Sequence, residues 1–139
     1  MSFEERSTWT YAALAFVIPV VYFTVVLRRL NGTEAAEVSY VTPMLIAIGT
    51  AVVLSILGSI VIALIWPREA GLKDERDTQI NRFGEYIGFY VISIGALVPL
   101  GLAMADIDQF WIANSLYLAF VLAALASSVV KIVAYHRGY

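Results

Sequence analysis

The chain has 139 residues, of which 60% are hydrophobic and only 14% are charged, and its formal net charge at pH 7 is −2. Its mean hydropathy is +0.80, whereas ordinary soluble domains carry about 25% charged residues. The small negative charge excludes a basic surface for nucleic acid. The absence of cysteine excludes disulfides, thiolate metal sites and thiol redox chemistry.

Four long windows of the sequence contain no charged residue. A helix that crosses a bilayer needs roughly 20 apolar residues, and each window reaches that length. A soluble helical bundle would carry charged residues on the outer face of each helix. The windows are Ser7–Leu27, Val38–Pro67, Tyr86–Ala105 and Gln109–Val130. The sequence therefore predicts an all-α, polytopic membrane protein, with residues 1–139 forming a single four-helix transmembrane domain.

The ends of the predicted helices follow from turn and capping residues. Asn31-Gly32 is typical of a helix end, and Pro43 suits the first turn of the next helix. Asp74 is a candidate cap for an amphipathic extension of the third helix. The helices are expected at about 9–30, 42–66, 84–105 and 109–135, with a loop at 67–83. The first helix is expected to be retained, because the residues before it lack the basic character of a signal peptide.

Two prolines lie in the middle of predicted spans, Pro19 in the first helix and Pro99 in the third. Their matching positions are consistent with two tandem helical hairpins related by an axis along the membrane normal. They are equally consistent with two independent kinks, which membrane helices tolerate. The sequence leaves both readings open.

Small residues recur at every fourth position in the second and fourth helices. Such faces let two helix backbones approach closely, and close packing is what associates helices in lipid. The pair Gly84 and Gly88 at the start of the third helix has the same character. The contacts can lie within the bundle or between subunits of a homo-oligomer. The two series are Ala47, Ala51, Ser55, Ser59 and Ala63, and Ser115, Ala119, Ala123, Ser127 and Lys131.

The basic residues predict the orientation, because Lys and Arg collect on the cytoplasmic side of short loops. Only Arg28 and Arg29 lie on the side of the first and third loops. The other seven of the nine lie on the side of the termini and the second loop: Arg6, Arg68, Lys73, Arg76, Arg82, Lys131 and Arg137. Both termini and the second loop are therefore predicted to be cytoplasmic.

The second loop is the main polar feature of the chain, and Asp74, Asp77, Asn81 and Glu85 form one helical stripe in it. Three interpretations are open. The stripe can cap and solvate a helix, it can dock a cytoplasmic protein partner, or its carboxylates can bind a divalent cation. The interspersed basic residues and the lack of a calcium-loop spacing count against the cation. We therefore predict no metal site and no cofactor.

The residues around this loop resemble a group of small bacterial four-helix membrane proteins of actinobacterial type. The resemblance is carried by Asp74-Glu-Arg-Asp-Thr-Gln-Ile80, by Glu5-Arg-Ser-Thr-Trp9 and by the segment from Ser128 to Arg137. It extends over nearly the whole chain. The resemblance implies a bacterial inner-membrane location and the four-helix topology, and it implies no activity.

Catalytic residues are not expected. The single histidine, His136, lies near the end of the sequence, and no nucleophile or phosphate-binding motif accompanies it. Ionisable residues, which coupled transporters keep within the membrane, are absent from the charge-free windows. Glu85 and Lys131 lie at cytoplasmic helix ends and are expected to form an ion pair. The sequence favours a non-enzymatic, self-associating membrane protein with a structural or regulatory role through its cytoplasmic loop. The alternative is a subunit of an oligomeric channel or small-solute transporter.

Overall fold

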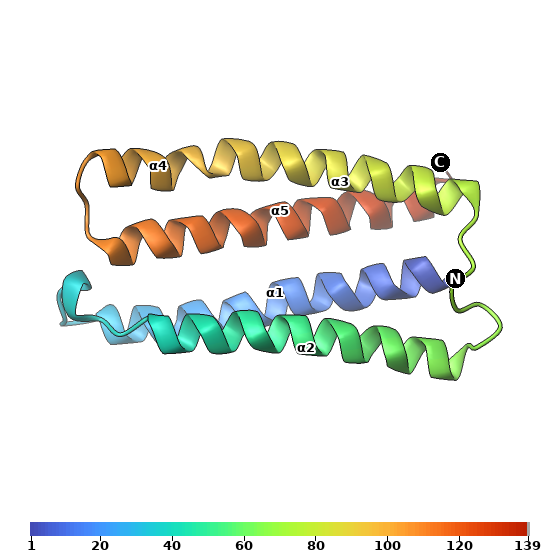
Figure 1. Ribbon diagram of the computed structural model, residues 1–139, viewed down its shortest axis with the longest axis horizontal. Helices are drawn as coiled ribbons and strands as arrows, with labels where there is room; N and C mark the ends of the chain where they lie inside the picture. The colour runs from blue at the N-terminus through green and yellow to red at the C-terminus, as the bar shows by residue number, and fades with distance from the viewer. Residues whose placement is uncertain (139) are drawn as a thin grey trace.

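The computed structural model describes residues 1–138, which form helices joined by short connections. Four long helical rods lie side by side, and successive rods run in opposite directions (Figure 1). The third rod consists of two helices, α3 and α4. The elements are α1 (Phe3–Leu30), the short 3-10 helix η1 (Ala35–Glu37), α2 (Val41–Ile65), α3 (Glu75–Gly95), α4 (Leu97–Met104) and α5 (Gln109–Arg137).

Each of the four rods is long and apolar enough to cross a membrane: Phe3–Leu30, Val41–Ile65, Glu75–Met104 and Gln109–Arg137. Most of their large apolar side chains face outward, and Leu64 and Met104 are 75% and 80% exposed. An apolar surface of this extent is unfavourable in water, but it matches the hydrocarbon core of a bilayer. The predicted all-α, four-helix membrane fold is confirmed.

Two helices begin where polar side chains cap them. Ser2 caps α1, and its Oγ accepts a hydrogen bond from the backbone N–H of Glu5 at 3.2 Å. Asp74 caps α3: its side chain accepts from the N–H of Asp77 at 2.7 Å, and the Asp77 side chain accepts from the N–H of Asp74 at 3.3 Å. This reciprocal pair is a capping box. The third rod therefore begins at Glu75, as expected for an extension of the third helix capped by Asp74, and the latter half of the 67–83 loop is helical.

The two mid-span prolines have different effects on their helices. Pro19 is buried inside the uninterrupted helix α1. Pro99 follows a break between α3 and α4, where Ala96 separates Gly95 from Leu97. Proline has no N–H to donate to the carbonyl four residues earlier, which for Pro99 is that of Gly95. The duplication of two hairpins stays a prediction, and at these two positions the hairpins differ.

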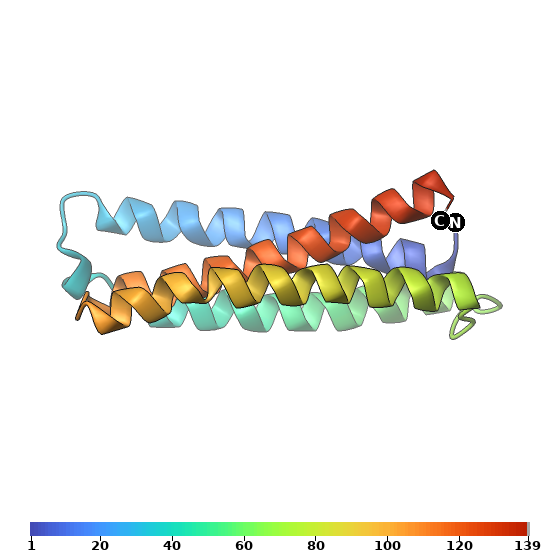
Figure 2. The same cartoon turned by 90° about the horizontal axis from the view of Figure 1, so that it is seen from above.

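The rods form an incomplete ring. Helix α2 packs on α1, α1 packs on α5, and α5 packs on both α3 and α4. Helices α2 and α3 have at most sparse contact with each other: α1 and α5 lie between them in Figure 1, and both lie on the same side of α1 in Figure 2. Both termini and the α2–α3 connection lie at the same end of the molecule. We call it the terminal end.

Small residues line the contact between α3 and α5. A β-carbon on Gly95 would lie 3.0 Å from Cβ of Ala119, and one on Gly88 would lie 3.3 Å from Cβ of Ser127 and 3.4 Å from the carbonyl oxygen of Ala123. The series predicted on the fourth helix, together with Gly88, thus packs within one chain. The close packing with α3 leaves this face no room for a second subunit.

The series of small residues predicted on α2 lies on the packed side of the helix except at one position. Ser55 is half-buried, but Ser59 is exposed. The close approach to α1 is instead made by Gly58, where a β-carbon would lie 2.8 Å from Cγ2 of Thr10. The helix-packing role predicted for Ser59 is therefore wrong, whereas Ala47 is buried and Ala51, Ser55 and Ala63 are partly buried.

Candidate functional site

A buried carboxylate joins three helices at the terminal end. Asp77 on α3 is only 4% exposed. Its Oδ1 accepts hydrogen bonds from the hydroxyl of Tyr135 on α5 at 2.8 Å and from Ser2 at the start of α1 at 3.4 Å. Its Oδ2 accepts from the backbone N–H of Asp74 at 3.3 Å. A buried carboxylate needs such donors in place of water, so Asp77 ties together the beginnings of α1 and α3 and the end of α5.

A second carboxylate, Glu4, lies in the first turn of α1. The side-chain amide of Asn81 on α3 donates to its Oε2 at 3.1 Å. The ammonium of Lys73, in the α2–α3 connection, lies 3.6 Å from its Oε1. The hydroxyl of Thr8 donates to the Glu4 carbonyl oxygen at 2.8 Å. The negative charge of Glu4 is thus compensated by a lysine from the connection.

The connection is also held to α1 by Arg6. Its guanidinium forms an ion pair with Glu69 and lies 3.9 Å from the ring centroid of Trp66. A cation over an indole face gains roughly 0.5–2 kcal/mol, depending on how far both groups are desolvated. Since Trp66 and Glu69 both belong to the connection, the first turns of α1 fix its position.

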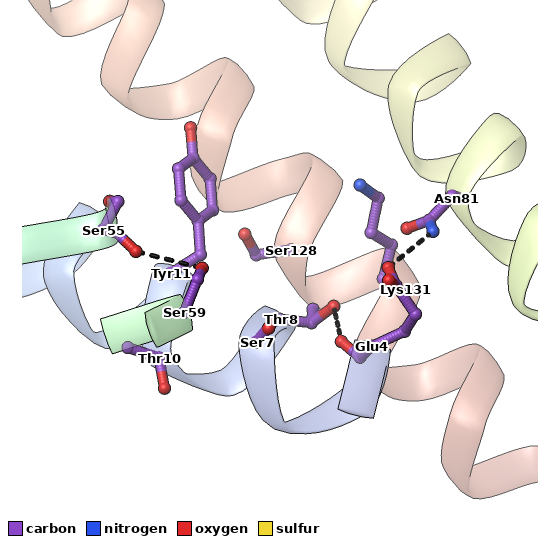
Figure 3. A pocket seen from close by; sticks show the side chains of 10 residues that line it. All are labelled: Glu4, Ser7, Thr8, Thr10, Tyr11, Ser55, Ser59, Asn81, Ser128 and Lys131. Carbon is purple, nitrogen blue, oxygen red and sulfur yellow. Dashed lines mark hydrogen bonds between the residues drawn. The ribbon is translucent and has the colours of Figure 1, made fainter. Parts of the chain in front are cut away.

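A cavity of about 210 Å³ lies next to these groups. Side chains from α1, α2, α3 and α5 converge on it (Figure 3). The oxygen of Ser7 is buried and has no hydrogen-bond partner among the described residues. The lining is polar for a site inside a membrane protein, and it consists of Glu4, Ser7, Thr8, Thr10, Tyr11, Ser55, Ser59, Asn81, Ser128 and Lys131.

Lys131 supplies the positive charge of this cavity. Its aliphatic stem packs over Gly84, where a β-carbon would lie 2.5 Å from Cγ of the lysine. Within residues 1–138, no carboxylate oxygen lies within 4.0 Å of its ammonium. Glu85 and Glu4 act on it only at longer range. The ion pair predicted between Glu85 and Lys131 is therefore wrong, because the stem of the lysine lies across Gly84 and Glu85 stays on the exposed face of α3.

The predicted docking stripe does not form one surface. Asp74 and Glu85 are exposed, but Asp77 is buried and Asn81 faces the cavity. A docking surface needs side chains that a partner can reach, so the four residues cannot act as one. The capping interpretation of Asp74 is confirmed by the capping box. Within residues 1–138, no three acidic or histidine residues lie close enough together to hold a metal ion.

Several residues of the site escaped the sequence patterns. Ser2, Glu4 and Tyr135 lie at the two ends of the chain, far in sequence from the α2–α3 connection that they contact. The available signal was the spacing of a helix start, which occurs twice in the sequence. Ser2 is followed three residues later by Glu5, and Asp74 is followed three residues later by Asp77. That signal predicts two capped helices without showing that the caps meet.

Four membrane-crossing rods with a polar cavity at the terminal end define a multi-pass, four-helix membrane protein. Comparison of the chain with known protein families, with curated proteins and with solved structures finds no match.

Proposed function

We propose that this chain is a small, non-enzymatic membrane protein with a regulatory role, which binds a ligand in the polar cavity and responds through its α2–α3 connection. One observation carries the proposal: Glu4 lines the cavity and also binds Lys73 of the connection. A ligand that bonds to the cavity wall competes for the partners of Glu4. Occupancy of the cavity and the position of the connection are therefore linked.

The terminal end faces the cytoplasm of a bacterial inner membrane in this proposal. The distribution of Lys and Arg supports the orientation, and the similarity of the Asp74–Ile80 segment to small bacterial membrane proteins supports the membrane. Self-association would use exposed apolar faces of the helices, since the small residues of α5 already pack within the chain.

A subunit of a channel or small-solute transporter is the second candidate. The observation that favours it is the depth of the cavity. Ser55 lines the cavity, and α2 ends at Ile65. At 1.5 Å per residue, Ser55 lies about 15 Å from that end, which is half the thickness of a hydrocarbon core of about 30 Å. This candidate requires flux of a solute through vesicles that contain the purified protein.

The ligand proposal is tested by filling the cavity. Ser59 lines it from an exposed position on α2, so Ser59→Phe adds a ring there without displacing a buried side chain. The control is Leu57→Phe, on the same helix and 49% exposed. Protein purified in mild detergent is extracted with solvent, and the extract is analysed by mass spectrometry. We expect one stoichiometric small molecule with the wild type and the control, and its loss with Ser59→Phe.

The response of the connection is measured on the same three proteins. Hydrogen exchange of residues 66–74 should differ between Ser59→Phe and the wild type, and it should be the same in Leu57→Phe and the wild type. Identical extracts and identical exchange in all three proteins would contradict the proposal.

A further inference from the structure

We infer that the ligand of the polar cavity is a phospholipid, with its phosphate on Lys131 and one acyl chain in an apolar groove that continues the cavity. This inference rests on the proposed function and specifies its ligand class. It is drawn from three features of the structure: the groove, the charge balance around Lys131 and the lateral opening between α2 and α3.

The apolar groove joins the polar cavity directly. It has a volume of about 230 Å³, and Tyr11 and Ser55 line both spaces. Its floor is α1, and its walls come from α2 and α5. Its lining is mainly apolar and includes Leu14, Pro19, Ala51, Val52, Phe120 and Ala124. The two spaces together form one channel-like depression that is polar towards the terminal end and apolar towards the middle of the bilayer.

The charges at the polar end favour an anion. Glu4 is already matched by Lys73 and by the amide of Asn81, which leaves the ammonium of Lys131 without a carboxylate partner in the described part of the chain. A charge held at membrane depth is costly unless it is paired. The buried hydroxyl of Ser7 has no partner in residues 1–138 and is a further donor for the same anion.

The depth and access of the site fit a lipid. Lys131 precedes the end of α5 at Arg137, so it lies about 9 Å inside that end of the helix. That is a depth at which a lysine can reach the phosphate level by extending its side chain. The opening between α2 and α3 faces the bilayer. A lipid entering there fills the polar and the apolar parts at once, whereas a soluble anion leaves the groove empty.

The inference is tested by titrating the detergent-solubilised full chain with two probes in native mass spectrometry. The probes are phosphatidylglycerol and the water-soluble glycerol 3-phosphate. Lys131→Met removes the cation and keeps the stem over Gly84, and Arg137→Met removes an exposed cation at the same end. We expect Lys131→Met to weaken binding of the lipid about tenfold or more, as a lost charge-assisted hydrogen bond does, and Arg137→Met to leave it unchanged.

The groove is tested separately with Ala124→Phe, which fills its α5 wall, against Val129→Phe, which is exposed on the same helix. Ala124→Phe should weaken binding of the lipid, and Val129→Phe should not. Lys131→Arg keeps the cation and should keep the binding, which separates lost charge from lost folding. Thermal unfolding in detergent confirms that each variant is folded.

The outcomes separate the inference from the proposed function. Equal lipid affinity in Lys131→Met and Arg137→Met overturns the inference. Glycerol 3-phosphate binding as tightly as the lipid, with no effect of Ala124→Phe, overturns the lipid assignment and leaves a ligand-binding cavity. If neither probe binds but solvent extraction still yields a stoichiometric molecule, the lipid assignment is likewise overturned and a ligand-binding cavity remains. Failure of both probes with an empty extract overturns the inference and the proposed function together.

Discussion

Asp77 shows how a single side chain can connect segments that are distant in sequence. Its carboxylate is removed from water, so its stability depends on donors from Tyr135, Ser2 and the backbone of Asp74. The same side chain takes part in the capping box that starts α3. Replacing it therefore removes one of the two hydrogen bonds of the capping box and leaves a tyrosine hydroxyl without an acceptor.

We expect Asp77→Ala to destabilise the protein by about 2–4 kcal/mol. Loss of the hydrogen bond to the N–H of Asp74 costs about 0.5–1.5 kcal/mol, and a buried polar group left without its partner costs about 1–3 kcal/mol. The measurement is thermal unfolding in detergent. Glu85→Ala on the exposed face of the same helix is the control and should change little. Equal stability of the two variants would mean that the carboxylate of Asp77 contributes nothing to folding.

The sequence could predict the local part of this arrangement and not the rest. Asp74 as a helix cap follows from residue type and spacing, because the partner of a cap lies three residues away. The burial of Asp77 depends on Ser2 and Tyr135, which only the tertiary fold brings near it. A stripe of polar residues on a helix indicates a solvated face when nothing packs there. Here the two ends of the chain cover it.

Glycine decides how closely the helical elements approach. In lipid there is little hydrophobic force between helices, so association depends on close packing and hydrogen bonds between them. Gly84, Gly88 and Gly95 each lie against α5, whereas a β-carbon on Gly49 or Gly101 would meet no neighbouring atom within 4 Å. A glycine therefore allows close packing only where it lies on the side of the helix that faces a neighbouring helix.

Gly95→Leu should destabilise the bundle, because even a β-carbon there would lie 3.0 Å from Cβ of Ala119. Overpacking costs typically about 1–3 kcal/mol, and we expect a lower unfolding temperature in detergent. Gly101→Leu on α4 is the matched control, since nothing surrounds that position. It should unfold at the wild-type temperature or slightly above it, because leucine favours a helix over glycine. A Gly95→Leu protein as stable as the control would show that α3 and α5 separate easily.

At the scale of helices, the sequence predicted the type and number of the secondary-structure elements better than it predicted which side of each helix packs against its neighbours. Composition and length alone predict four spans, because a bilayer imposes both. On α2 the prediction was wrong at Ser59, which is exposed, and it missed Gly58, where a β-carbon would meet Thr10. Which helices touch could not be predicted, because in lipid every apolar face looks alike.

The buried apolar cluster and the ion pairs lie toward different ends of the molecule, although the loops at both ends carry charged residues. Near the end opposite the terminal end, Tyr22, Val26, Val38, Ala47 and Phe110 form the apolar core. The ion pairs of residues 1–138 lie at the terminal end and connect α1 with the α2–α3 connection. Nδ1 of His136 on α5 lies 4.0 Å from a carboxylate oxygen of Glu5 on α1. The terminal end thus joins α1 to the α2–α3 connection through charged groups, and the apolar cluster joins α1, α2 and α5 near the other end.

The orientation of this asymmetric molecule in the membrane is predicted from its basic residues, seven of nine of which belong to the side of the termini and the α2–α3 connection. Because the chain has no cysteine, single cysteines can report it without background. Thr78 is exposed near the start of α3, and Thr33 is exposed at the opposite end. With a membrane-impermeant thiol reagent, Thr33→Cys should react in intact cells, and Thr78→Cys should react only after the cells are opened. The reverse pattern would place the cavity, Lys131 and the connection on the outer face, and any partner or ligand would then have to reach them from there.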